Sequence, residues 1–128
     1  MTMRWRRVRS NPAPRTPGAT LLGLLGLAAR AGALVFGTEQ VRAAVRDGSA
    51  RLVILAADAA VGQQTKLLPL LEARGVVHFM GPSRGELGAA TGRAPVSAVG
   101  LIDAGFARRA SELLGALAAR QAQAQEEV

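Results

Sequence analysis

The chain has no cysteine and only one histidine, and these absences exclude several kinds of chemistry. Without cysteine there is no disulfide bond, no thiolate metal ligand and no cysteine nucleophile, and one histidine leaves little for a zinc site. That histidine, His78, stands between apolar neighbours in a strand-like segment, a position more typical of a packed or edge residue than of a general base. No nucleophile motif accompanies it. We therefore expect a protein that is not an enzyme and that holds no metal and no cofactor.

Aromatic residues and long apolar runs are also scarce. Aromatics make up 3% of the chain, whereas 49% is hydrophobic, mostly alanine, leucine and valine, so the core is expected to consist of small aliphatic contacts. Few aromatics also argue against binding nucleic acid on stacked aromatic platforms. The longest largely apolar run, residues 19–29, is well short of the roughly 20 residues of a membrane-spanning helix. We predict a soluble, cytoplasmic protein with no membrane partner.

Acidic residues are absent from the first 19 positions, which hold five arginines and three prolines. The formal net charge of the chain is +7, and removing those arginines leaves 11 basic and 9 acidic residues. Proline and lack of apolar residues oppose regular structure, so we predict a flexible arm over residues 1–19. Such an arm suits a polyanion, and a leader without a binding role is the alternative.

The rest of the chain alternates between helical and strand-like segments. Helices are expected at 20–31, 38–47, 63–74, 83–92 and from about 103 to 120, and strands at 34–36, 52–56, 76–80 and 96–102. Strict alternation favours a single-domain α/β fold, a three-layer α/β/α sandwich with helices on both faces of a four-stranded mixed sheet. We predict that this domain spans residues 20–120 and that residues 121–128 form a frayed C-terminal tail.

Local signals mark the ends of these helices. The predicted N-terminal caps are Thr20, Thr38 and the Ser83-x-x-Glu86 capping box, and the predicted stops are Gly32 and Gly75. Gly23 and Gly26 lie inside the first helix, where glycine costs about 1 kcal/mol relative to alanine. We expect both to allow close packing on a neighbouring element.

Three loops are expected to meet at one edge of the sheet. Ligands of alternating α/β folds bind beyond the carboxyl ends of the strands, where helix N-termini converge. The segments at that position are Gly37–Gln40, Ala57–Ala60 and Gly92–Ser97. A glycine turn before a helix, as at Gly37, leaves backbone N–H groups and the positive end of the helix dipole free for a phosphate or a base edge.

Several of these segments, taken in order, carry a resemblance to a known family. Leu27–Gly32, Gly37–Val41, Leu52–Ala59 and Glu86–Gly88 resemble the L7Ae family of kink-turn RNA-binding ribosomal proteins, and most of all its bacterial YlxQ-type branch. The resemblance covers about residues 20–118. It implies an α/β/α sandwich and a monomeric ribonucleoprotein component that binds kink-turn-like, structured RNA and is associated with the ribosome.

The family's Gly-x-Asn-Glu-Val-x-Lys segment, which reads sheared G·A pairs, matches residues 37–43 with changes. Gly37 and Val41 are kept, whereas Glu39, Gln40 and Ala43 replace the asparagine, the glutamate and the lysine. Glutamine both donates and accepts hydrogen bonds, whereas an ionised glutamate only accepts and would repel phosphate.

The resemblance implies a site built from three groups of residues. We expect base contacts from Gly37, Thr38, Glu39 and Gln40, phosphate contacts from Arg42, Arg46 and Lys66, and a grip on an extruded nucleotide from Arg93, Ala94, Pro95, Val96 and Ser97. Two alternatives stay open at this point. One is the RNA-substrate-binding partner of an RNA-modifying enzyme, and the other is a protein-interaction module without RNA specificity.

Overall fold

The computed structural model describes the backbone of residues 17–126 and the side chains of residues 20–120. The helices of this part are α2 (Pro17–Arg30), α3 (Thr38–Arg46), α4 (Val61–Arg74), α5 (Arg84–Ala90) and α6 (Ala104–Glu126). The strands are β1 (Leu34–Phe36), β2 (Leu52–Ala56), β3 (His78–Gly81) and β4 (Ala98–Leu101). Every predicted helix and strand is therefore present. The predicted arm falls largely outside the described residues, and only its positions 17–19 are seen, at the start of α2.

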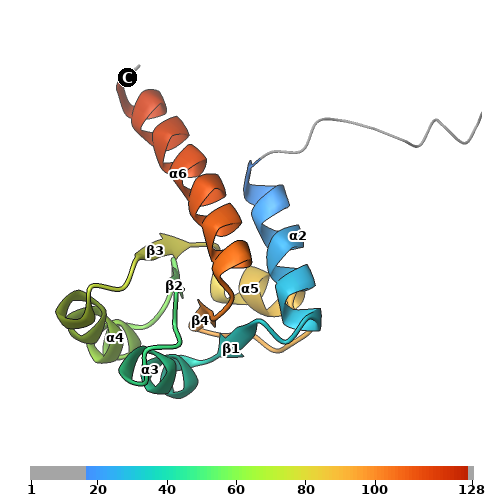
Figure 1. Cartoon of the computed structure of the whole chain (residues 1–128). Helices are drawn as coiled ribbons and strands as arrows, with labels where there is room; N and C mark the ends of the chain where they lie inside the picture. The colour runs from blue at the N-terminus through green and yellow to red at the C-terminus, as the bar shows by residue number, and fades with distance from the viewer. Residues whose placement is uncertain (1–16, 127–128) are drawn as a thin grey trace, which may run out of the picture.

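The strands form one mixed sheet in the order β1-β4-β2-β3. β4 is antiparallel to both β1 and β2, whereas β2 and β3 are parallel. In Figure 1, α3 and α4 lie on one side of the sheet, and α2, α5 and α6 lie on the other. This arrangement confirms the predicted three-layer sandwich.

The core has two apolar layers because β2 and β4 are covered on both faces. All five residues of β2 and all four of β4 are buried. Leu21, Leu25 and Leu87 of α2 and α5 pack in the layer on one face, with Ile54 and Val99. A smaller layer on the other face is made by Val41, Val45, Val53, Leu67 and Leu71, together with Leu55 and Ala98. Aliphatic side chains thus form nearly the whole core. No helix within residues 17–126 is long and apolar enough to cross a membrane.

Two predicted caps are wrong. The first helix begins at Pro17, so Thr20 lies within its first turns, and proline suits this start because the first helical N–H has no partner in any case. The second helix begins at Thr38 itself, and its N-cap is Gly37, without a side-chain cap. The last helix also continues past Arg120 to Glu126, since the alanines and glutamines of that segment favour helix.

The predicted glycine stops and the predicted capping box are confirmed. Gly32 and Gly75 adopt the positive φ angles that end α2 and α4. Ser83 Oγ accepts from the Glu86 N–H at 3.1 Å, and Glu86 Oε1 accepts from the Ser83 N–H at 2.9 Å, which completes the capping box of α5. Strand β3 begins two residues and ends one residue later than its predicted range, and β4 begins two residues later and ends one residue earlier than predicted.

Close approach of backbone to backbone explains two glycines. A Cβ on Gly26 would lie 2.8 Å from the Ala90 carbonyl oxygen, so this glycine lets α2 pack against α5. A Cβ on Gly23 would meet no neighbouring element within 4 Å among the described residues, so the close packing predicted for Gly23 is wrong. A Cβ on Gly88 would overlap the Ala94 carbonyl and lie 2.8 Å from the Arg93 oxygen. The Arg93 N–H also donates to the Gly88 carbonyl at 2.8 Å, so the loop after α5 rests directly on this helix.

We predict that Gly88→Ala destabilises the protein by about 1–3 kcal/mol, because the added methyl group overpacks the contact between α5 and the loop. The matched control is Gly85→Ala in the same helix, where the new Cβ would meet only Ser83 Oγ at 4.0 Å. That change should leave stability unchanged or raise it by up to about 1 kcal/mol. Urea unfolding measures the free energy of unfolding of both variants. Equal changes in the two variants would show that the contact between Gly88 and the loop does not require glycine.

Candidate functional site

Strand direction brings three chain segments to one edge of the sheet. β1 and β2 end at this edge and β4 begins there, because β4 runs against both neighbours. The Gly37 N–H donates to the Ala98 carbonyl at 2.9 Å, and the Ala56 N–H donates to the Ser97 carbonyl at 2.8 Å. The loop before β4 is thereby fixed to the ends of both neighbouring strands.

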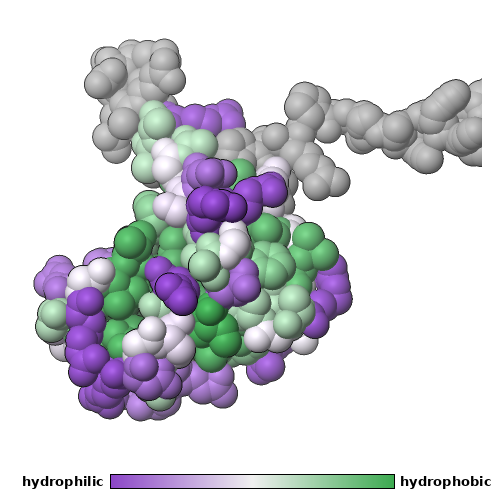
Figure 2. Space-filling view, viewed as in Figure 1, coloured by the Kyte–Doolittle hydropathy of each residue, from purple (hydrophilic) through white to green (hydrophobic). Residues whose placement is uncertain are grey.

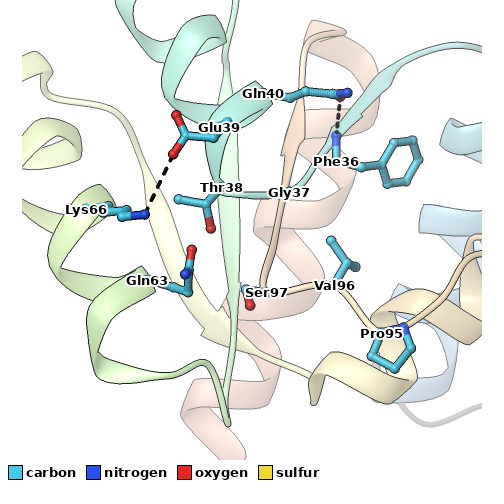
Figure 3. A pocket seen from close by; sticks show the side chains of 10 residues that line it. All are labelled: Phe36, Gly37, Thr38, Glu39, Gln40, Gln63, Lys66, Pro95, Val96 and Ser97. Atoms are coloured by element: carbon cyan, nitrogen blue, oxygen red, sulfur yellow. Dashed lines mark hydrogen bonds and ion pairs between the residues drawn. The ribbon is translucent and has the colours of Figure 1, made fainter.

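A hollow of about 550 Å³ opens between these segments (Figure 3). It is lined by Phe36, Gly37, Thr38, Glu39, Gln40, Gln63, Lys66, Pro95, Val96 and Ser97. Eight of these were predicted from the sequence, and they come from the start of α3, from α4 and from the loop before β4. Phe36 and Gln63 were missed. The sequence predicts Phe36 only as part of a strand and Gln63 only as part of a helix. The packing of α4 against α3 turns Gln63 toward the hollow, and a sequence pattern does not reveal this packing.

The floor of the hollow includes the start of α3. Gly37 has φ 88° and ψ 158°, a conformation essentially restricted to glycine, and this sharp turn starts the helix at Thr38. No side chain caps the helix. Thr38 is only 8% exposed, and in Figure 3 its hydroxyl points toward Gln63 and Ser97. This helix end therefore presents backbone N–H groups and a partial positive charge beside the hollow.

Gln40 has a defined orientation. The Phe36 N–H, on the free edge of β1, donates to Gln40 Oε1 at 3.0 Å. A backbone N–H can only donate, so the oxygen of the amide must face it and the NH₂ group must face away. The exposed half of Gln40 is therefore a hydrogen-bond donor. The sequence predicts that Gln40 can both donate to and accept from a ligand, and this contact leaves only the donor group for the ligand.

Glu39 lies between two cations. Its Oε1 is 3.2 Å from Arg42 Nη1 on the same helix, and its Oε2 is 3.9 Å from Lys66 Nζ on α4. Figure 3 shows the Glu39–Lys66 pair across the rim of the hollow. The carboxylate is 70% exposed, so these pairs add little to stability, but they reduce its repulsion toward an anionic ligand. The three side chains together carry one net positive charge.

The predicted nucleotide-holding loop divides into two parts. Pro95, Val96 and Ser97 line the hollow, whereas Ala94 is exposed outside it. Arg93 places its guanidinium carbon 3.7 Å from the centre of the Phe36 ring. Stacking of this kind holds the guanidinium flat beside the hollow, at the end formed by Phe36 and Pro95.

Other predicted residues lie elsewhere. Arg42 contacts Glu39 but does not line the hollow, and its buried Nε has no hydrogen-bond partner among the described residues. Arg46 lies in the last turn of α3, at the other end of that helix. The predicted loop Ala57–Ala60 is also absent from the hollow, because Asp58 Oδ1 accepts the Arg84 N–H at the start of α5, at 2.7 Å.

Histidine and acidic side chains are scattered singly over the described part of the chain. Within it no three histidine, cysteine, aspartate or glutamate side chains lie close enough to hold a metal ion. His78 is half-buried on edge strand β3, and its Nδ1 lies 2.9 Å from the Val76 carbonyl, as expected of an edge residue. The exposed carboxyl of Asp47 has its pKa held below the usual value by hydrogen bonds from Ser49, at the C-terminal end of α3 and away from the hollow.

Comparisons with known proteins agree on one family. The sequence model of the ribosomal protein L7Ae/L30e/S12e/Gadd45 family matches residues 19–111. A curated relative, the RNA-binding protein YlxQ of Enterococcus faecium, is 33% identical over 93 residues, which are 73% of this chain and 89% of the relative.

Solved structures of two relatives are also similar. A Bacillus halodurans protein of unknown function is 40% identical with a TM-score of 0.73, over 76% of this chain and 98% of the relative. The Giardia lamblia 15.5kD RNA binding protein is 27% identical with a TM-score of 0.67, over 84% of this chain and 92% of the relative.

We predict that Gly37→Ala destabilises the protein by about 1–3 kcal/mol, because a side chain at this φ and ψ is strained even though no atom lies within 4 Å of the new Cβ. Gly62→Ala in the first turn of α4 is the control, since it also meets no atom but has no positive φ. It should be neutral or stabilising. Thermal unfolding compares the melting temperatures of the two variants. Similar melting temperatures would show that alanine is not strained at position 37.

Proposed function

Since the chain belongs to the ribosomal protein L7Ae/L30e/S12e/Gadd45 family, we propose that it is a non-enzymatic RNA-binding protein that holds a kink-turn-like, structured RNA at the hollow. The observation that supports this most is that Gly37–Gln40, Lys66 and Pro95–Ser97, which the family resemblance assigns to RNA, lie together on one surface. The names of the relatives from Enterococcus faecium and Giardia lamblia point the same way.

The start of α3 is suited to contact base edges. The outward NH₂ group of Gln40 donates to acceptors such as guanine O6 or N7, and the Glu39 carboxylate accepts from base amino groups. The free helix N-terminus and Lys66 favour a nearby phosphate. In the proposed complex, the sheared G·A pairs lie over this part of the hollow.

The loop before β4 is suited to hold an unpaired nucleotide. Pro95 and Val96 offer apolar atoms, and the Arg93 guanidinium, stacked on Phe36, offers a flat cationic surface next to them. Arginine planes stack on unpaired RNA bases, so scarcity of aromatic residues is no obstacle to this kind of contact. An extruded kink nucleotide fits this end of the hollow.

Binding to two RNAs tests the proposal. We expect the protein to bind a kink-turn duplex more tightly than a plain duplex of matched length at both low and high salt. Gln40→Ala should reduce that preference by about 1–3 kcal/mol, the usual value of a good base contact. Gln64→Ala is the control, because Gln64 lies outside the hollow. Equal affinity of the wild-type protein for both RNAs would refute recognition of the kink.

Glu39 offers a second test through its charge. Glu39→Asn restores the family residue, removes a negative charge near the proposed phosphates and releases Arg42 and Lys66 from their ion pairs. We expect tighter binding of the kink-turn RNA by about fivefold, the effect of roughly 1 kcal/mol for one charge at 4 Å in water. Glu112→Gln on α6 removes one charge far from the hollow and serves as control. Asparagine keeps an acceptor oxygen for a base amino group, so weaker binding by Glu39→Asn would contradict this expectation and show that the contact needs the negative charge of the carboxylate.

We further propose that the protein acts in the cytoplasm on ribosomal RNA. Crosslinking in cells, followed by sequencing of the attached RNA, should recover kinked segments of ribosomal RNA. Recovery of unrelated transcripts in proportion to their abundance would contradict ribosome association while leaving RNA binding itself intact.

A further inference from the structure

A second basic surface lies at the opposite edge of the sheet. There, the residues just before β2 and β3 and the last turn of α4 surround a hollow of about 360 Å³, which is lined by Arg51, Arg74 and apolar residues such as Val76 and Val77. Arg74 Nη1 donates to the Arg46 carbonyl at 2.9 Å and so joins the end of α4 to the end of α3. We call Arg46, Arg51 and Arg74 the arginine cluster.

The three guanidinium groups are available to a ligand. All three residues are exposed, and among the described side chains none of them forms an ion pair. Arg74 uses one N–H on the Arg46 carbonyl, and a guanidinium has five. The adjacent carboxylate, Asp47, accepts the Ser49 N–H at 2.9 Å. With Asp47 included, the surface keeps a net charge of +2.

Helix α3 connects this surface to the proposed RNA site. Glu39, Arg42 and Arg46 are spaced three and seven residues apart and so lie along one face of the helix. Seven residues of α-helix span about 10 Å. In the view of Figure 2, hydrophilic side chains gather at the lower left, where Figure 1 places α3 and α4. A ligand that is bound at the start of α3 and extends along the helix would therefore reach the arginine cluster at the other end of α3.

We propose that the arginine cluster binds backbone phosphates of the RNA duplex that flanks the kink. This inference rests on the proposed function, and it adds a second contact region to it. Two helices end here with partial negative charge, which disfavours a small free anion, whereas forked guanidinium groups spread over an open surface match the repeated phosphates of a duplex. The cluster reads no sequence; it fixes the direction in which the flanking helix leaves the hollow.

The test measures how affinity depends on salt for a charge-neutralised variant, Arg46→Gln/Arg51→Gln/Arg74→Gln. If the cluster meets about three phosphates, the slope of log K against log salt should become shallower by about 2.7, and binding at 0.1 M salt should weaken by roughly two orders of magnitude. The control is Arg108→Gln/Arg109→Gln/Arg120→Gln on α6, which removes the same charge from exposed positions on the other face of the sheet. Its slope should change by less than about one.

The length of the RNA separates this contact from the hollow. On a kink-turn RNA trimmed close to the kink, the cluster variant and the wild type should bind alike, whereas Gln40→Ala should remain weak on both lengths. Arg51→Gln alone tests whether misfolding causes the loss, because the Arg51 side chain forms no hydrogen bond or ion pair with the described residues. This single change should make the slope of log K against log salt shallower by about 0.9.

The outcomes distinguish the two proposals. If the wild type prefers the kink-turn RNA but the cluster variant matches the α6 control, the cluster has no role and the proposed function stands. If the wild type binds kinked and plain duplex equally, the proposed function fails. A loss of affinity by the cluster variant that is equal on long and trimmed RNA would overturn the assignment to the flanking duplex.

Discussion

The site depends on one strand that runs against its neighbours. β4 lies between β1 and β2, is buried along its whole length and is antiparallel to both. Its first residues therefore stand where the other two strands end, and the N–H groups of Gly37 and Ala56 donate to the carbonyls of Ala98 and Ser97. Two segments some 60 positions apart in the chain, the start of α3 and the loop before β4, are held as one surface by these bonds.

Small residues set how closely the layers around this strand approach. With few aromatics, the core excludes water by bringing backbones together, and Gly26 and Gly88 allow this where helix α5 meets α2 and the loop. The position of Pro95–Ser97 relative to α3 thus follows from contacts beneath the loop, on the side away from the hollow. A core residue such as Gly88 acts on the site without touching it.

The sequence predicted the elements well because their signals are local. A capping box, glycine stops and short apolar runs each act within a few residues, and all of them recur in the structure. The errors involve competition between local options. Thr38 has a good capping side chain, yet the chain turns one residue earlier because Gly37 alone adopts the required conformation. Gln63 and Phe36 could not be assigned to the site, since tertiary packing and not residue type places them there, and the site as a whole stays a prediction.

The orientation of a side chain also lies beyond sequence, and here it changes the chemistry of the site. Gln40 as a residue type is both donor and acceptor, but the unpaired N–H at the edge of β1 takes its oxygen and leaves only a donor outside. A glutamate in general repels phosphate, but the Glu39 carboxylate forms ion pairs with Arg42 and Lys66, which partly neutralise its negative charge. Those two cations are in turn partly engaged by Glu39, which leaves the hollow with little free positive charge. In the proposed complex the N-terminus of α3 contacts bases, so further electrostatic attraction has to come from another part of the surface. Arg46, two turns further along α3, is placed to supply it.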